Sequence, residues 1–338
     1  MKHFRLGALL AGALAALPMA GFAADYTLVI SSWTSPQHGI NAKMWPRFTE
    51  MVEEATGGRV TAELKLDLGP PQAQTDLVQD GIADVSIIAH SYQTGRFPST
   101  KLAELPGYAA STEDFSVAYW RAYEKYMKAA DEHRGLKLLA LHTNGPAQLH
   151  SHSKVTTLDE IAGMKLRITG EAMGQAVNAL GATGIQVPAP KVYETLSSNA
   201  ADGVLMPMEA RVGFRLTEVA ENVYEMPGGF GRFSFAFVMN EDVFNALPAD
   251  IRAALDEKVF GEPLSRELGR IWDEIDEIGR AGTLAAEGNA ITAASAEDRA
   301  EFARRTAGLR QAIIDEVAAT GIDAAAVVQM LETAGQDN

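Results

Sequence analysis

The sequence predicts an α/β protein made of two similar lobes that face each other across a cleft. Stretches typical of β-strands alternate with stretches typical of helices, which favours layered sheets with largely parallel pairing. A short motif also repeats, because residues 79–85 (QDGIADV) resemble residues 197–203 (SSNAADG) 118 positions later. With 338 residues the chain is long enough for two domains. Two lobes of this kind commonly close around a ligand.

The first part of the chain alternates strands and helices. The elements expected there are a strand at 26–32, a helix at 41–55 capped by Asn41, a strand at 60–66, a helix opened by Pro70 and Pro71, and a strand at 84–88. The strand at 60–66 is predicted by alternation of apolar and polar residues, and the helix at 41–55 is closed by Gly57 and Gly58.

The middle of the chain repeats this alternation, and the end is helical. The predicted elements are strands at 136–142, 148–152 and 164–168, a short helix at 157–161, and a helix at 170–180. Apolar residues recur at helical spacing from about residue 250, and Pro263 is expected to bend or break that helix. The spacing of apolar residues at 296–333 predicts two further amphipathic helices.

The N-terminus has the three parts of a secretory signal peptide. Lys2 and Arg5 give a positive start, and twelve uncharged residues follow at 6–17. Small residues Gly21 and Ala23 then suit cleavage after Ala23 or Ala24. The apolar run is short for a bilayer span, which disfavours the alternative of an uncleaved anchor. We therefore expect residues 1–23 to be removed and the mature protein to lie in the periplasm, without stable membrane insertion.

Charge and cysteine content exclude several functions. The 29 Lys and Arg against 44 Asp and Glu give a formal net charge of −15, which opposes binding to nucleic acids and anionic lipids. The absence of cysteine excludes disulfides, thiolate catalysis and cysteine-ligated metals. No cofactor and no metal are expected.

The strongest candidate for ligand binding is Arg167. It lies near the end of the strand at 164–168, directly before the predicted start of a helix. In parallel α/β sheets, ligands bind beyond the carboxyl ends of strands and beside helix N-termini. A guanidinium beside helix N–H groups favours a carboxylate. The equally weighted alternative is a surface arginine paired with Glu171.

Polar residues on a neighbouring strand are further candidates. Gln148, His150 and His152 share one face of the strand at 148–152, which suits the polar lining of a cleft better than a metal site. A periplasmic enzyme that uses His150 or Glu209 as acid or base is therefore an alternative interpretation. No nucleotide-binding, hydrolase or metalloprotease motif is present to support it.

Several segments resemble one family over nearly the whole mature chain. These are GPPQ (69–72), DGIADVSIIAHSYQTGRFP (80–98), AELPG (103–107), GMKLRITGEAMGQAVNALGATGIQVPAPKVYETLSSNAADGV (163–204) and FVMNEDVFNALPADIRAALD (237–256). The chain resembles the DctP-type solute-binding proteins of tripartite ATP-independent periplasmic (TRAP) transporters. The block at 163–204 argues against a third interpretation, a binding protein of an ATP-driven importer.

The resemblance implies a periplasmic-binding-protein fold with a central cleft, a hinge and a long helix that spans both domains. We expect domain I to comprise 24–146 and 235–275, and domain II to comprise 147–234 and 276–338. The implied function is capture of an organic acid and its delivery to TRAP membrane permease subunits. The resemblance further implies that Arg167 clamps the ligand carboxylate.

Two departures from the family pattern change the expected ligand. Met206 stands where many members carry a polar asparagine, and Gln148 stands where many carry a basic residue. A pocket without these partners favours a monocarboxylate with an apolar or aromatic body over a dicarboxylate. The residues expected to line this pocket are Trp33, Tyr92, Gln148, His150, Met206, Glu209 and Phe235, in addition to Arg167.

Overall fold

The computed structural model describes residues 24–336, so the predicted signal peptide at 1–23 lies outside the described residues. The strands are β1 (Tyr26–Ser32), β2 (Val60–Leu66), β3 (Val85–Ala89), β4 (Leu136–Thr143), β5 (Gln148–Ser151), β6 (Lys165–Ile168), β7 (Thr183–Gln186), β8 (Gly203–Met206), β9 (Asn222–Glu225), β10 (Ser234–Asn240) and β11 (Ala290–Ala293). Each strand expected from the sequence is present within one or two residues of its predicted position.

The helices follow the predicted order and add several that the sequence did not indicate. They are α1 (Trp45–Thr56), α2 (Gln74–Gln79), α3 (Lys101–Glu104), α4 (Thr112–Ala122), α5 (Glu171–Ala179), α6 (Val192–Ser197), α7 (Ala210–Gly213), α8 (Glu241–Ala246), α9 (Ala249–Lys258), α10 (Glu262–Ala285), α11 (Ala296–Ala318) and α12 (Ala324–Glu332). The predicted short helix at 157–161 is a 3₁₀ turn, Leu158–Ile161.

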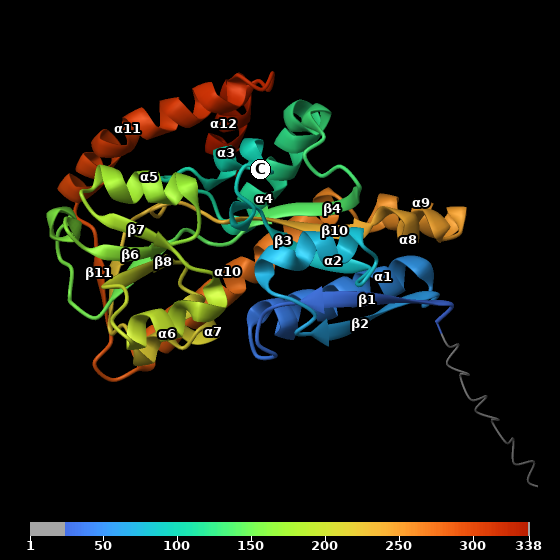
Figure 1. The fold of residues 1–338 in the computed structure, drawn as a ribbon, viewed down its shortest axis with the longest axis horizontal. Coiled ribbons are helices and arrows are strands. Elements are labelled where there is room, and N and C mark those ends of the chain that lie inside the picture. The colour runs from blue at the N-terminus through green and yellow to red at the C-terminus, as the bar shows by residue number, and fades with distance from the viewer. Residues whose placement is uncertain (1–23, 337–338) are drawn as a thin grey trace, which may run out of the picture.

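The strands form two mixed sheets, one in each lobe (Figure 1). Lobe I is built on a sheet of order β2-β1-β3-β10-β4, and lobe II on a sheet of order β11-β9-β5-β8-β6-β7. The expected parallel pairing holds for only part of each sheet, because β10 runs antiparallel to β3 and β4, and β5 runs antiparallel to β8 and β9. Both antiparallel strands follow a crossing of the chain from one lobe to the other, which reverses its direction.

The repeated motif marks the same corner in both lobes. Asp84 exchanges hydrogen bonds with Val29, since its carboxylate accepts from the Val29 N–H at 2.7 Å and its own N–H donates to the Val29 carbonyl. Asp202 does the same with Lys165, also at 2.7 Å. Each aspartate thus ties the start of one strand to its parallel neighbour. The sequence repeat therefore corresponds to a repeated structural device.

Asn41 does not cap a helix, contrary to the prediction. It lies within a π-helical turn, Ile40–Met44, that runs directly into α1. Its side chain is buried, accepts from the Ser32 hydroxyl at 2.6 Å and donates to the carbonyls of Thr34 and Ser35. Asn41 instead holds the 33–39 loop against the end of β1.

The long helix α10 spans the two lobes, as predicted (Figure 1). It packs against α4 and β4 of lobe I and against α7 and β11 of lobe II. The helical segment is interrupted between α9 and α10. Pro263 lies in the first turn of α10, where a backbone N–H would make no hydrogen bond within the helix, so proline is tolerated there. The predicted break at Pro263 is therefore confirmed.

The two segments that link the lobes run side by side. Asn144 and Ala147, between β4 and β5, donate backbone hydrogen bonds to the carbonyls of Phe233 and Gly231, between β9 and β10. The Ala147 carbonyl accepts from the Phe230 N–H. These paired segments and α10 connect the lobes, and they place the ends of β4, β5 and β10 beside the region where the lobes meet.

The last helix does not follow the predicted division into domains. The apolar side of α12, with Val327, Val328 and Leu331, packs in one cluster with Phe115 and Tyr119 of lobe I. We expected the whole segment 276–338 to lie in domain II, but α12 returns to the first lobe because its apolar face is buried there. The domain boundaries themselves remain predictions.

Candidate functional site

A cavity with about 250 Å³ of empty space lies where the lobes meet. Residues from several strand ends and from both linking segments line it. They are Asn144, Ala147, Arg167, Thr169, Met173, Ala189, Leu205, Met206, Pro207 and Phe233. Most of this lining is apolar, and Arg167 is its one charged side chain among the described residues. Arg167 comes from the end of β6, and Leu205 and Met206 come from the end of β8.

Arg167 is fully buried, and its guanidinium is held from two sides. Its Nε donates to the Val187 carbonyl at 2.7 Å, and its Nη2 donates to the Tyr92 hydroxyl at 3.1 Å. Its Nη1 has no hydrogen-bond partner within residues 24–336. Burial lowers the pKa of Arg167, although the nearby Tyr92 opposes this shift. An arginine stays charged in proteins, so a buried cation here has an unused donor that an anion would satisfy.

The alternative of a surface pair between Arg167 and Glu171 is wrong. Arg167 has no exposed area, and Glu171 pairs instead with Lys101 at 2.8 Å. The reason is the register of β6, which lies between β7 and β8 and turns the Arg167 side chain into the protein.

Aromatic side chains pack in series from Tyr92, which contacts Arg167, but the predicted wall residues Tyr92 and Trp33 are not among the residues that line the cavity. The Tyr92 hydroxyl accepts from Arg167 and also from the Ala189 N–H, and burial raises the pKa of Tyr92, which keeps it neutral. The Tyr92 ring packs edge-on against Phe233 at 5.0 Å and Trp33 at 6.4 Å. Phe235 packs against Phe233 at 4.8 Å and does not itself line the cavity.

Met206 and Gln148 sit opposite each other on paired strands but have different surroundings. Met206 lines the cavity with Arg167. Gln148 bonds to backbone, since its Oε1 accepts from the Met226 N–H at 2.7 Å and its Nε2 donates to the Pro146 carbonyl. The polar atoms of Gln148 are thus already engaged by the linking segments.

His150 and Glu209 lie apart from the residues that line the cavity. His150 is fully buried and donates from Nε2 to the Met206 carbonyl at 2.9 Å. Burial lowers the pKa of His150 to about 3, so this ring is neutral at physiological pH. Glu209 is buried against His38, 3.3 Å from its Nε2. The two groups considered as acid or base are therefore engaged elsewhere.

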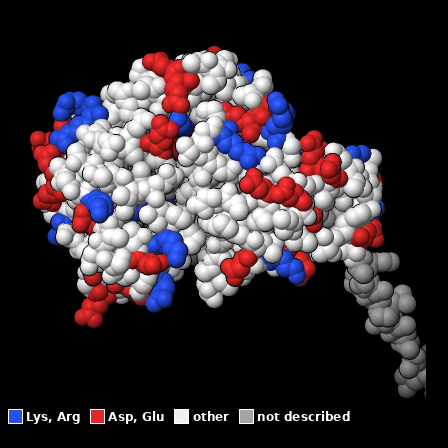
Figure 2. Space-filling view, in the orientation of Figure 1, with Lys and Arg blue, Asp and Glu red and all other residues white. Residues whose placement is uncertain are grey.

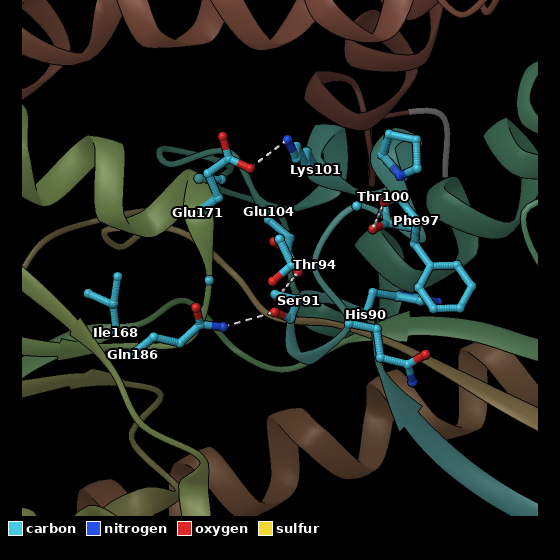
Figure 3. A pocket seen from close by; sticks show the side chains of 15 residues that line it. His90, Ser91, Thr94, Phe97, Thr100, Lys101, Glu104, Ile168, Glu171 and Gln186 are labelled. Carbon is cyan, nitrogen blue, oxygen red and sulfur yellow. Dashed lines mark hydrogen bonds and ion pairs between the residues drawn. The ribbon is translucent and has the colours of Figure 1, made fainter. Parts of the chain in front are cut away.

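A second, more open pocket with about 800 Å³ of empty space lies between the lobes (Figure 3). The 89–95 loop and α3 form one side, and the end of β6 with α5 forms the other. Polar contacts bridge it, because Gln186 donates to the Ser91 carbonyl at 3.1 Å and Lys101 pairs with Glu171. Ser91 also donates to Glu104 at 2.5 Å, and burial raises the pKa of Glu104 to about 7.

The lobes touch closely along this pocket. A Cβ at Gly170 would come within 2.3 Å of the Ser91 side chain, although the Gly170 backbone is extended and would suit any residue. Contact with the other lobe, and not backbone geometry, therefore favours glycine at this position.

Sequence reasoning missed several residues that line the Arg167 cavity. Asn144 closely follows the predicted strand at 136–142, and Thr169 follows the Arg167 strand, so position at a strand end was a usable signal for both. Phe233 precedes β10 in a run of aromatic residues whose spacing favours plain core. Its place in the cavity depends on the antiparallel insertion of β10, which the sequence did not predict.

Comparison with known proteins gives the class of this chain. Residues 30–316 match the family described as bacterial extracellular solute-binding protein, family 7, or DctP. A TRAP periplasmic solute-binding protein from Bordetella bronchiseptica, solved with bound (R)-mandelate and (S)-mandelate, is 34% identical with a TM-score of 0.87. The match covers 92% of this chain and 99% of that one.

Two other solved structures are also similar. The TRAP solute-binding protein from Rhodoferax ferrireducens T118, in complex with copurified benzoate, is 28% identical with a TM-score of 0.84, covering 91% of this chain and 96% of that one. A marine metagenome TRAP solute-binding protein specific for aromatic acid ligands, in complex with metahydroxyphenylacetate, is 27% identical with a TM-score of 0.83, covering 91% and 97%.

This chain therefore belongs to the extracellular solute-binding proteins of family 7. Within that class it is a TRAP solute-binding protein of the DctP type, as its resemblance to that family suggested. The family consists of extracytoplasmic solute receptors. Within residues 24–336, no helix combines the length and apolar character needed to cross a bilayer.

Proposed function

We propose that this protein captures an aromatic monocarboxylate in the periplasm and delivers it to a TRAP permease. The observation that carries the proposal is Arg167, a fully buried cation with an unused donor in a cavity that is otherwise mostly apolar. A guanidinium binds a carboxylate through parallel hydrogen bonds, and desolvation strengthens this interaction. The apolar walls suit the rest of such a ligand.

The similar structures support an aromatic body for the ligand. Their bound molecules are mandelate, benzoate and metahydroxyphenylacetate, each a single carboxylate with an aromatic ring. Phe233 gives the Arg167 cavity an aromatic wall suited to such a ring, and Tyr92, which packs against both Phe233 and Trp33, holds Arg167 without lining the cavity. Edge-to-face contacts with an aromatic ligand would add to the area buried.

The cavity lining favours one carboxylate over two. Met206 presents an apolar thioether, and no second cation lines the cavity among residues 24–336. A second carboxylate would be buried without a partner, which costs several kcal/mol or forces its protonation. Dicarboxylates should therefore bind weakly.

The proposal includes export and a membrane partner. Cleavage after Ala23 or Ala24 would release a periplasmic receptor, and TRAP permease subunits would receive its cargo. The mass of the protein from a periplasmic fraction tests the cleavage, since it should begin at Ala24 or Asp25. A stable full-length chain in the cytoplasm would contradict export.

A binding panel tests the ligand class. Isothermal calorimetry of the unliganded protein should show stoichiometric binding of benzoate or mandelate and much weaker binding of succinate and malate. Native mass spectrometry of protein purified without refolding should show whether an acid is retained. Tighter binding of succinate or malate than of every aromatic monoacid would refute the proposal. Conversion of a bound acid to product would favour the enzyme interpretation.

A further inference from the structure

Asn144 supplies a second unused donor in the cavity of Arg167. Its side chain is 5% exposed and lines the cavity together with Arg167. Its Oδ1 accepts from the Phe233 N–H at 2.9 Å. Its Nδ2 makes no hydrogen bond to any residue that the structure describes at 24–336.

The bond to Phe233 determines which way the amide faces. A backbone N–H can only donate, so the atom that it contacts must be the carbonyl oxygen of Asn144 and not its nitrogen. The backbone of Asn144 is also tied on both sides, to the Phe233 carbonyl and to Arg232. The Asn144 amide is therefore fixed through its oxygen, and its N–H group is the end left to donate to a molecule in the cavity that Asn144 lines.

The other side chains that line the cavity offer almost no hydrogen-bond acceptor to Arg167 and Asn144. Thr169 directs its hydroxyl to the Met173 sulfur at 3.7 Å, and the other lining side chains are alanine, leucine, methionine, proline and phenylalanine. The polar part of the cavity thus consists of one cation and one neutral amide donor. A ligand that fills it best carries an anion and a second, neutral acceptor close to that anion.

We propose that Asn144 donates to an oxygen carried on the carbon next to the ligand carboxylate, so that the site selects 2-hydroxy and 2-oxo aryl acids. This inference rests on the proposed function. In this arrangement Arg167 would take the carboxylate and the apolar walls would take the ring. Asn144, which lines the same cavity as Arg167, would donate to the atom beside the carboxylate. An acid without that oxygen leaves a buried N–H unpaired, which a site built for hydrogen bonding penalises strongly.

The test compares acids that differ only at this position. Calorimetry with the wild-type protein should show mandelate and benzoylformate bound at least tenfold more tightly than phenylacetate. Benzoylformate is essential because its 2-oxo group accepts but cannot donate, as a contact with the Asn144 N–H requires. Benzoylformate bound no better than phenylacetate would overturn the inference without any substitution.

Asn144→Ala provides the second arm. The variant should lose at least tenfold in affinity for mandelate and less than threefold for phenylacetate, since only mandelate used the lost donor. The matched control is Asn240→Ala, because Asn240 also accepts from a backbone N–H, that of Val243, but lies outside the cavity. The control should leave the ratio of the two affinities unchanged.

The outcomes separate this inference from the proposed function. An equal loss for both acids in Asn144→Ala would overturn the inference, since Asn144 would then contact only the carboxylate or only Phe233. Wild-type protein that binds aromatic acids without preference would overturn the inference alone. Wild-type protein that binds none of these acids would overturn both.

Discussion

Arg167 and Arg211 are both fully buried in lobe II, but they are satisfied to different degrees. Arg211 donates from Nε to Thr283 at 3.0 Å, from Nη1 to the carbonyls of Leu216 and Ala220, and from Nη2 to Asn289. Burial lowers the pKa of Arg211 to about 10 and also lowers that of Arg167. Of the two, Arg167 alone has a nitrogen without a partner in residues 24–336, and it alone lines the cavity.

Burial and a lowered pKa are common to both arginines, so these two properties by themselves do not identify a binding residue. Every nitrogen of Arg211 is used to hold α7 and the following turn against the end of α10, which is a structural task. The unused Nη1 of Arg167 is what an incoming anion can complete. Substitutions should therefore divide into those that weaken binding and those that weaken the fold.

Arg167→Ala should give the largest loss of binding. Removing one partner of a buried charge pair costs about 2–5 kcal/mol, which corresponds to roughly 30-fold to several-thousand-fold in affinity. Arg167→Lys should also bind poorly, because it keeps the charge but loses the planar fork. Calorimetry with mandelate measures both, and circular dichroism checks folding. A folded Arg167→Ala that binds within threefold of wild type would contradict the assignment.

Arg211→Ala should instead lower stability. It leaves the Ala220 carbonyl without its side-chain donor, whereas the Leu216 carbonyl still accepts from the Ala220 N–H, so the cost is about 1–3 kcal/mol. Urea denaturation measures the change in unfolding free energy. The fraction that remains folded should bind mandelate within threefold of wild type. An Arg211→Ala variant that is as stable as wild type but no longer binds mandelate would contradict the structural role of Arg211.

Glu104→Gln should change how stability depends on pH. Because burial raises the pKa of Glu104 from 4.5 to about 7, the folded state favours the protonated carboxyl. Stability from this group is fully present below pH 4.5 and is lost as pH rises through 7, by about 3 kcal/mol in total. Glu104→Gln should abolish that component, since glutamine has no proton to release.

Thermal unfolding of wild type and Glu104→Gln across about pH 4–8 checks this. The wild type should lose stability relative to the variant as pH rises, and the loss should not reverse at the alkaline end. Parallel curves for the two proteins over the whole range would show that Glu104 does not titrate as stated.

Gly170→Ala should give the smallest effect, and on binding alone. The added methyl group would come within 2.3 Å of Ser91 in the other lobe, and such overpacking costs about 1–3 kcal/mol. We expect the ligand-bound state to be the one in which the lobes touch, so that this state alone is destabilised. Affinity should then fall roughly 5- to 150-fold. Urea denaturation of the unliganded protein should be unchanged. Equal loss of stability would show that the lobes touch without ligand as well.

Local patterns in the sequence predicted much of the architecture. The strands at 26–32 and 60–66, the break at Pro263 and the repeated Ala-Asp corners were all readable from a few neighbouring residues. Each depends on periodicity, turn chemistry or a backbone restriction, which act within one element. The resemblance to the DctP family, which the comparisons confirm, added the spanning helix and the class of ligand.

The net charge of the protein could also be read from its composition alone. On the face seen in Figure 2, acidic and basic side chains are interspersed toward the periphery, and the area between the two halves carries few of them. Net charge follows from residue counts alone, but the position of an uncharged area depends on which segments meet there. The overall acidity therefore disfavours nucleic acids and anionic lipids as partners, but it does not locate the site.

The tertiary structure decided which residues form the cavity. The pairing of β10 between β3 and β4 brings Phe233 and Asn144 beside Arg167, which lies on another sheet. Tertiary contacts also direct Gln148 to backbone groups, and they place α12 on lobe I. Helix and strand propensities are local properties of the chain, so the sequence by itself determined these elements. Burial and hydrogen-bond satisfaction depend on contacts between distant segments, and only the folded chain brings those segments together.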